Sequence, residues 1–178
     1  IVGGGLAGAS LAVALRNSRL RIALVEGRPP QRPAADAWDA RVYAVSPANA
    51  VFLDSIGAWR HMDAARISPI RTMRIVGDAG GALEFSAFQT GVPDLGCILE
   101  SSLMACELWE GLKRQSNVQL FLPASPQGLE FRHDAVVLQL AGGERLSAAL
   151  LVGADGRDSW VREAAGLVAV NRHYGEKG

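Results

Sequence analysis

The sequence predicts an α/β fold built on a parallel sheet, and three observations near its start support this prediction. The chain opens with "IVGGGLAGASLAVAL", in which an apolar stub is followed by closely spaced glycines and then by small, helix-forming residues. The next apolar run, in "LRIALVEGR", is short and β-branched, as in strands buried in parallel sheets. The order strand, glycine turn, helix and strand is typical of a Rossmann-like unit.

The glycine spacing indicates what the first turn binds. Gly3, Gly5 and Gly8 form the pattern G-x-G-x-x-G. In this pattern the first glycine allows the turn, the second lets a pyrophosphate approach the backbone, and the third lets the helix pack on the strand. Glu26 ends the second strand, where a carboxylate can accept hydrogen bonds from the hydroxyls of an adenosine ribose. Ordinary turn glycines and a solvated strand end remain the alternative interpretation.

The composition narrows the function classes. Eighteen basic side chains balance eighteen acidic ones, so the net charge gives no reason to expect nucleic acid or an anionic membrane surface as a partner. Cys97 and Cys106 are too few and too widely spaced for a disulfide framework or a metal cluster. We therefore expect no metal site and a reducing, cytoplasmic location. No apolar stretch reaches the roughly twenty residues that cross a bilayer.

The middle of the chain predicts a loop, a helix and several strands. Residues 27–41 are rich in Pro and Ala and lack a period, which indicates a surface loop. Ser46, followed by a proline, is expected to cap a helix that ends near Gly57. Residues 70–87 read as two strands around a glycine-rich turn, and residues 95–100 as a further strand.

The last third of the chain predicts a helix, an antiparallel ribbon and a returning strand. Ser101 or Ser102 is expected to cap the helix. The tight "AGGE" between two alternating runs predicts a hairpin, so we expect an antiparallel ribbon that crosses over the parallel sheet. The run "ALLVGAD" then returns as a buried strand, followed by a helix that Asp158 or Ser159 caps and Gly166 ends.

A second candidate site follows that returning strand. In "GADGRDSWVR", Asp155 and Gly156 lie at the carboxyl end of the strand, the edge of an open α/β sheet where ligands bind. A carboxylate there can anchor a ribose hydroxyl or order water near a pyrophosphate. An ordinary Asp-Gly turn is the alternative.

Four segments carry a family resemblance: "IVGGGLAGASLAVAL" with Glu26, "DARVYAVSPANAVFLDSIGAW", "LGCILESSLMACELW" and "LLVGADGRDSWVREAAG". Taken together, they resemble the FAD-dependent aromatic hydroxylases, the class A flavin monooxygenases, and within them the ubiquinone-biosynthesis hydroxylase branch. The resemblance covers nearly the whole chain and implies a Rossmann-like FAD/NAD(P)-binding fold. It implies an FAD-binding domain over residues 1–68 and 101–178, interrupted at 69–100 by part of a β-rich substrate domain.

The resemblance also implies roles for residues in the first half of the chain. Gly3, Gly5, Gly8 and Glu26 would bind the ADP half of FAD, with Arg28 beside the adenosine.

Further along, Arg41 would lie against the flavin cofactor, which suits a planar and permanently charged guanidinium; a surface cation is the alternative. Asp155 and Gly156 would support the pyrophosphate and the approach of NAD(P)H. Ser101 stands where relatives often have Asn, so Glu100 and Ser101 receive no binding role. The family's later Gly-Asp motif does not occur in these residues, so we expect an N-terminal fragment that alone neither retains FAD firmly nor catalyses a reaction.

The implied activity is hydroxylation of an aromatic ring with FAD, NAD(P)H and O₂, on a polyprenylated phenol of ubiquinone biosynthesis. In such enzymes the cofactor supplies the chemistry. The sequence accordingly contains no recognisable nucleophile or acid–base dyad, and no catalytic residue is assigned. His61, His133 and His173 stand apart from any Ser or Cys pattern. A polyprenylated substrate implies peripheral contact with the inner membrane or with a biosynthetic complex. Another FAD-linked or NAD-linked oxidoreductase, or a non-catalytic nucleotide-binding module, remains an alternative.

Overall fold

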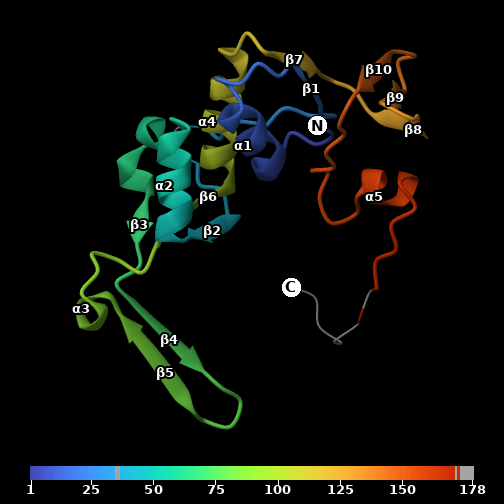
Figure 1. The fold of residues 1–178 in the computed structure, drawn as a ribbon. Coiled ribbons are helices and arrows are strands. Elements are labelled where there is room, and N and C mark those ends of the chain that lie inside the picture. Colours follow the sequence, from blue (N-terminus) through green and yellow to red (C-terminus); the bar gives the residue numbers. More distant parts are fainter. Residues whose placement is uncertain (35–36, 171, 173–178) are drawn as a thin grey trace. The chain divides into compact units, whose positions relative to one another are not determined.

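The computed structural model describes residues 1–34, 37–170 and 172 (Figure 1). Two compact units share the chain. Unit 1 contains Ile1–Gly8, Arg21–Pro29 and the described residues from Val118 onward, and unit 2 contains Ala9–Leu20 and the described residues of Pro30–Asn117. The helix α1 (Leu6–Ala14) runs from the first unit into the second. The domain boundaries that the sequence suggests at residues 68 and 100 stay a prediction.

Unit 1 is built around a parallel sheet of short strands. The strand β1 (Ile22–Val25) pairs in parallel with β7 (Val118–Phe121). On the other side of β1, Val2 forms parallel bridges to Val25 and to Gly153. Val2 and Val25 are each only 2% exposed, because a strand within a parallel sheet is covered on both faces. The predicted parallel sheet is therefore confirmed. The prediction of a buried strand over "ALLVGAD" was wrong, because only Gly153 forms a bridge, to Val2, and Leu150 is 74% exposed.

An antiparallel ribbon and a short helix complete unit 1. The ribbon has the strand order β10–β9–β8, with bounds β8 (Pro126–Phe131), β9 (Val136–Leu140) and β10 (Arg145–Ala148). The helix α5 (Trp160–Ala164) follows, and its N-cap Ser159 accepts a hydrogen bond from the backbone N–H of Arg162 at 3.0 Å. One hydrophobic cluster joins the sheet, the ribbon and the helix through Val2, Val25, Leu138, Leu140 and Val161. The predicted ribbon and the serine cap are confirmed.

Unit 2 contains two main helices and two single 3₁₀ turns. The helices are α2 (Pro47–Ser55) and α4 (Ser101–Lys113), and the turns are η1 (Trp59–His61) and η2 (Ala64–Arg66). As predicted, the side chain of Ser46 caps α2 by accepting from the backbone N–H of Asn49 at 3.3 Å, and proline is the first helical residue. Gly57, at φ +77°, follows the end of that helix.

A small antiparallel sheet lies in the same unit. Its central strand β6 (Cys97–Glu100) pairs with β2 (Val42–Val45) on one side and with β3 (Ser68–Pro69) on the other. Gly96 immediately precedes β6 at φ +141°, and a Cβ atom there would lie 2.6 Å from the carbonyl oxygen of Val45. Both the backbone conformation and the close approach of the neighbouring strand therefore require glycine at this position.

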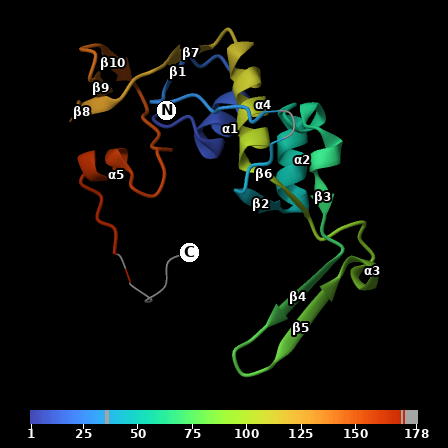
Figure 2. The ribbon, with the colours of Figure 1, turned by 180° about the vertical axis from the view of Figure 1, so that it is seen from behind.

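The hairpin of β4 (Thr72–Val76) and β5 (Ala82–Ser86) extends away from this small sheet, and the short helix α3 (Ala87–Thr90) follows it (Figure 2). Its two faces differ in character. One face presents two apolar cross-strand pairs, Met73 with Phe85 and Ile75 with Leu83, whose exposed fractions run from 39% to 55%. The other face carries the pair of Arg74 and Glu84. The two predicted strands are confirmed.

The start of α4 differs from the prediction of a serine cap. Both serines lie inside the helix, and Glu100 occupies the cap position without a side-chain capping bond. The backbone N–H of Ser102 instead donates to Asp39 Oδ2 at 3.1 Å, and that of Ser101 donates to the carbonyl oxygen of Arg41 at 2.8 Å. The prediction was wrong because a distant loop supplies the acceptors that a local serine would otherwise provide. In the described part of the chain, no helix is both long and apolar enough to cross a membrane.

The contact at Gly96 gives a direct test of the fold. We expect Gly96→Ala to lower the free energy of unfolding by about 1–3 kcal/mol, because the new Cβ meets a carbonyl oxygen in a backbone conformation that alanine rarely adopts. Urea unfolding of the purified protein measures the change. Gly81→Ala is the matched control: it lies in the β4–β5 turn without positive φ and with no atom within 4 Å of its added Cβ. The control should change stability by less than about 0.5 kcal/mol, and equal losses would contradict the account.

Candidate functional site

The first glycine turn lies at the edge of the unit 1 sheet, between two neighbouring backbone segments. The N–H of Gly3 donates to the carbonyl oxygen of Val25 at 2.9 Å, and the N–H of Ala154 donates to the carbonyl oxygen of Val2 at 2.7 Å. Gly3 has φ +99°, and an added Cβ would overlap the carbonyl oxygen of Ala154. The turn therefore brings the chain start into backbone contact with the segment before Asp155.

The other two glycines of the pattern have different surroundings. A Cβ atom on Gly8 would overlap the carbonyl oxygen of Gly3, so α1 starts in direct contact with the turn. Gly5 is exposed, has no positive φ, and has nothing within 4 Å of an added Cβ. Neither packing nor backbone conformation within the protein requires glycine at position 5. The open space there fits a pyrophosphate that approaches the backbone, so the residues present suit the ADP half of a dinucleotide.

Glu26 holds the glycine turn through its carboxylate. Its Oε2 accepts a hydrogen bond from the N–H of Gly4 at 2.6 Å, and its Oε1 accepts one from the N–H of Arg28 at 2.9 Å. A carboxylate has about four acceptor positions, so both oxygens still have capacity for a ribose hydroxyl. The side chain of Arg28 is exposed beside this group.

Asp155 stabilises the start of α5. Its Oδ1 accepts from the Ser159 hydroxyl at 2.6 Å, and its Oδ2 accepts from the N–H of Val161 at 2.9 Å. Burial alone would raise the pKa of Asp155, but these hydrogen bonds outweigh burial and the pKa is lowered from its ordinary value. The carboxylate is therefore charged at neutral pH. Gly156 follows at φ +90° with open space around an added Cβ.

A pocket of about 230 Å³ opens among these groups in unit 1. Gly3, Glu26 and Asp155 line it, so the structure brings together three of the residues singled out in the sequence. The lining also includes three side chains for which no binding role was predicted: Ser125, Asp158 and Trp160. Ser125 belongs to the loop after β7, and no local pattern marks it. Trp160 lies in the quoted "GADGRDSWVR" segment, where an aromatic ring near a strand end is the signal that could have indicated it.

Arg41 belongs to unit 2, where its backbone is fixed on both sides. Its N–H donates to Asp39 Oδ1 at 2.9 Å, and its carbonyl oxygen accepts from the N–H of Ser101 at 2.8 Å. The side chain itself is exposed. The structure thus defines the loop that presents this guanidinium.

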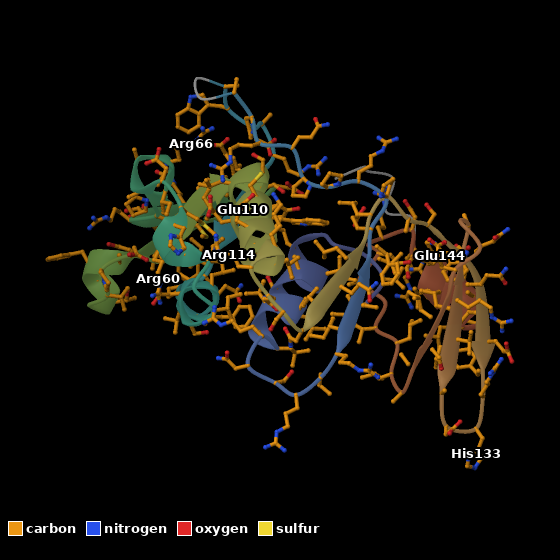
Figure 3. All side chains as sticks on the ribbon, turned by 90° about the horizontal axis from the view of Figure 1, so that it is seen from above. Arg60, Arg66, Glu110, Arg114, His133 and Glu144 are labelled. Atoms are coloured by element: carbon orange, nitrogen blue, oxygen red, sulfur yellow. The ribbon has the colours of Figure 1, made fainter. Side chains whose placement is uncertain are left out.

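The two described histidines are exposed, and both cysteines are buried. His133 is exposed at the tip of the β8–β9 turn (Figure 3), and His61 is exposed in η1. His173 lies outside the described residues. Cys97 and Cys106 are buried free thiols, and burial raises the pKa of each. Within residues 1–34, 37–170 and 172, no group of three or more His, Cys, Asp or Glu side chains could hold a metal ion.

Comparison with known proteins extends this description. Residues 1–175 match a family model described as an FAD binding domain. The chain is 33% identical over 168 residues to the 3-demethoxyubiquinol 3-hydroxylase of Escherichia coli, an alignment that covers 94% of this chain and 43% of that protein. It is 34% identical over 177 residues to the ubiquinone hydroxylase UbiL of Rhodospirillum rubrum, covering 99% of this chain and 41% of that protein. The chain therefore spans less than half the length of these two relatives.

A solved structure shows the same fold. The chain resembles a crystal structure of PqsL from P. aeruginosa with a TM-score of 0.78 at 19% sequence identity, over 97% of this chain and 46% of that one. At this identity the likeness concerns the fold, and it confirms the predicted α/β class with its parallel and antiparallel sheets.

The contrast between Gly5 and Gly8 yields a test of the site. We expect Gly5→Ala to leave the free energy of unfolding within about 0.5 kcal/mol of the parent, because its Cβ meets no protein atom. The same change should weaken binding of FAD by about tenfold or more, which is the effect of losing roughly 1.4 kcal/mol of binding free energy. Urea unfolding and titration of the full-length apoprotein with FAD measure the two quantities.

Gly8→Ala is the matched comparison, because its Cβ would overlap the Gly3 carbonyl oxygen. This variant should lose about 2 kcal/mol or more of stability. Parent-like FAD binding by Gly5→Ala would show that no ligand approaches the backbone at that position.

Proposed function

The chain belongs to the family of FAD binding domains, and from that premise we propose that unit 1 holds the ADP half of FAD for an aromatic-ring monooxygenase of ubiquinone biosynthesis. The observation that supports this most strongly is the free space at Gly5, beside a turn that is otherwise packed to backbone contact. Beside this crowded turn, a glycine that neither packing nor backbone conformation requires leaves room for a ligand to approach the backbone.

The charges around the pocket support FAD over a phosphorylated nicotinamide cofactor as the resident group. The backbone N–H groups in the first turn of α1, a nine-residue helix, suit the pyrophosphate. Glu26 suits the unmodified ribose hydroxyls of FAD, and its negative charge would repel a 2′-phosphate. Trp160 supplies an aromatic surface in the same pocket. We place Arg28 beside the adenosine and Arg41 against the flavin cofactor.

The proposed reaction follows from the family and from the names of the relatives. When bound, FAD supplies electron transfer from NAD(P)H and the activation of O₂. One oxygen atom enters the aromatic ring, the other leaves as water, and NAD(P)H is oxidised. The residues of this chain bind and orient the cofactor, and Asp155 with Gly156 supports the pyrophosphate side of the site.

The relatives also suggest the substrate. Two of them are named as hydroxylases of ubiquinol or ubiquinone compounds, which supports a phenol of that pathway as the substrate of the full-length protein. We further propose that this phenol carries a polyprenyl tail, and that the enzyme is cytoplasmic and works peripherally at the inner membrane or within a biosynthetic complex.

Oxygen incorporation tests this function. The full-length enzyme with FAD and NADH or NADPH should consume O₂ faster when a ubiquinone-precursor phenol is added. With isotopically labelled O₂, the label should appear in the hydroxylated product. Product that forms equally well without O₂ would favour an FAD-linked dehydrogenase on the same fold. A colourless protein that takes up no FAD would favour a non-catalytic nucleotide-binding module.

A further inference from the structure

An ion pair in unit 2 is almost completely enclosed. The guanidinium of Arg66 donates to Glu100 twice, from Nε to Oε1 at 2.7 Å and from Nη2 to Oε2 at 2.6 Å. The side chain of Glu100 is 2% exposed and that of Arg66 is 17% exposed. Two parallel charge-assisted hydrogen bonds fix the relative orientation of the two groups more strictly than a single contact would.

The same ion pair holds the neighbouring loop of residues 37–39. Glu100 Oε2 accepts a hydrogen bond from the N–H of Asp39 at 2.7 Å, and Arg66 Nη2 donates to the carbonyl oxygen of Ala37 at 2.7 Å. The guanidinium carbon also lies 4.6 Å from the centre of the Trp38 ring, a cation–π distance. Arg66 lies at this loop (Figure 3), so three successive residues are attached to one pair.

From this loop the constraint continues to Arg41. Asp39 Oδ1 accepts from the N–H of Arg41, and its Oδ2 accepts from the N–H of Ser102 at the start of α4. The carbonyl oxygen of Arg41 accepts from the N–H of Ser101. The N–H and the carbonyl oxygen of Arg41 are therefore both hydrogen-bonded, while its side chain is exposed.

Both carboxylates in this chain of contacts stay charged. The N–H of Arg41 lowers the pKa of Asp39, and the hydrogen bonds from Arg66 lower the pKa of Glu100, in each case against the raising effect of burial. A buried ion pair gives little net stability, because desolvation of the charges offsets their attraction. The arrangement is better explained by the geometry that it fixes than by the stability that it adds.

We propose that Glu100, acting with Arg66 and Asp39, is a positioning residue for Arg41. The ion pair fixes the loop and the loop fixes the backbone of Arg41, which sets the point and direction from which its exposed side chain extends to contact the flavin cofactor. The inference rests on the proposed role of Arg41 in binding FAD.

A double-mutant cycle on the full-length protein tests the inference, with the dissociation constant of FAD as the measured quantity. Arg41→Ala should weaken FAD binding by about tenfold, the loss expected when one charged hydrogen-bonding group is removed. Glu100→Gln should weaken binding by roughly threefold to tenfold, because one of the two acceptor oxygens becomes a donor NH₂ group and the amide cannot accept all three hydrogen bonds from Arg66 and Asp39. The variant that combines both changes should bind FAD no more weakly than Arg41→Ala alone.

Glu107→Gln is the matched control within the same unit. Glu107 accepts a hydrogen bond from Arg32 Nη2 at 2.7 Å and its side chain is 10% exposed, so the change also removes one partner of an ion pair. It should leave the dissociation constant of FAD unchanged. If Glu107→Gln weakens FAD binding as much as Glu100→Gln does, general loosening of the unit explains the effect and the inference is wrong.

Asp39→Ala keeps the inference testable if Glu100→Gln fails to fold. It removes the acceptor for the N–H groups of Arg41 and Ser102 but leaves the pair of Arg66 and Glu100 intact. It should weaken FAD binding in the parent and have no further effect in the Arg41→Ala background, with circular dichroism confirming a native fold.

The remaining outcomes separate the inference from the proposed function. If Arg41→Ala leaves FAD binding unchanged, the proposed cofactor role of Arg41 fails and the inference fails with it. If Arg41→Ala weakens binding but neither Glu100→Gln nor Asp39→Ala does, only the positioning role is wrong. If the effects of Glu100→Gln and Arg41→Ala multiply in the combined variant, Glu100 acts independently of Arg41 and the inference is overturned.

Discussion

Backbone contact around Gly3 and Gly8 is the constraint on which unit 1 depends. A side chain at Gly8 would overlap the carbonyl oxygen of Gly3, and one at Gly3 would overlap that of Ala154. The chain start, the first turn of α1 and the segment before Asp155 can therefore approach one another only as backbone. This approach brings Glu26 and Asp155, from distant parts of the sequence, to the rim of one pocket. The same crowding leaves Gly5 as the one glycine of the pattern whose added Cβ would meet nothing.

Carboxylates that accept backbone N–H groups recur in both units. Glu26 holds the glycine turn, Asp155 holds the start of α5, and Asp39 holds both Arg41 and the start of α4. Each acid fixes the backbone of a turn, a loop or the start of a helix, and a residue proposed to bind the cofactor lies close to each in the sequence. Glu26 and Asp155 can each hold the protein backbone and also bind a ligand, because a carboxylate that accepts two hydrogen bonds retains capacity for more.

Features that depend on neighbouring residues could be predicted from the sequence. The serine caps at Ser46 and Ser159 and the glycine turn after the first strand follow from local chemistry, and all were present in the structure. The cap of α4 could not be predicted, because its acceptor is Asp39, 63 residues before Ser102. Ser125 in the pocket is a similar case, since it follows a strand whose pairing with β1 brings it there. The cap of α4 and the place of Ser125 both depend on which distant segments pack together, and local sequence patterns do not encode that.

Backbone hydrogen exchange of the full-length protein, measured with and without FAD, tests most directly whether the crowded turn is the cofactor site. The account predicts that FAD slows exchange of the amides in residues 3–8, where the pyrophosphate meets the backbone, and of those near Glu26 and Asp155. The amides of the β8–β9 turn around His133 should exchange at the same rate in both states. If FAD binds while exchange in residues 3–8 stays unchanged, the ADP half lies elsewhere and the central claim is contradicted.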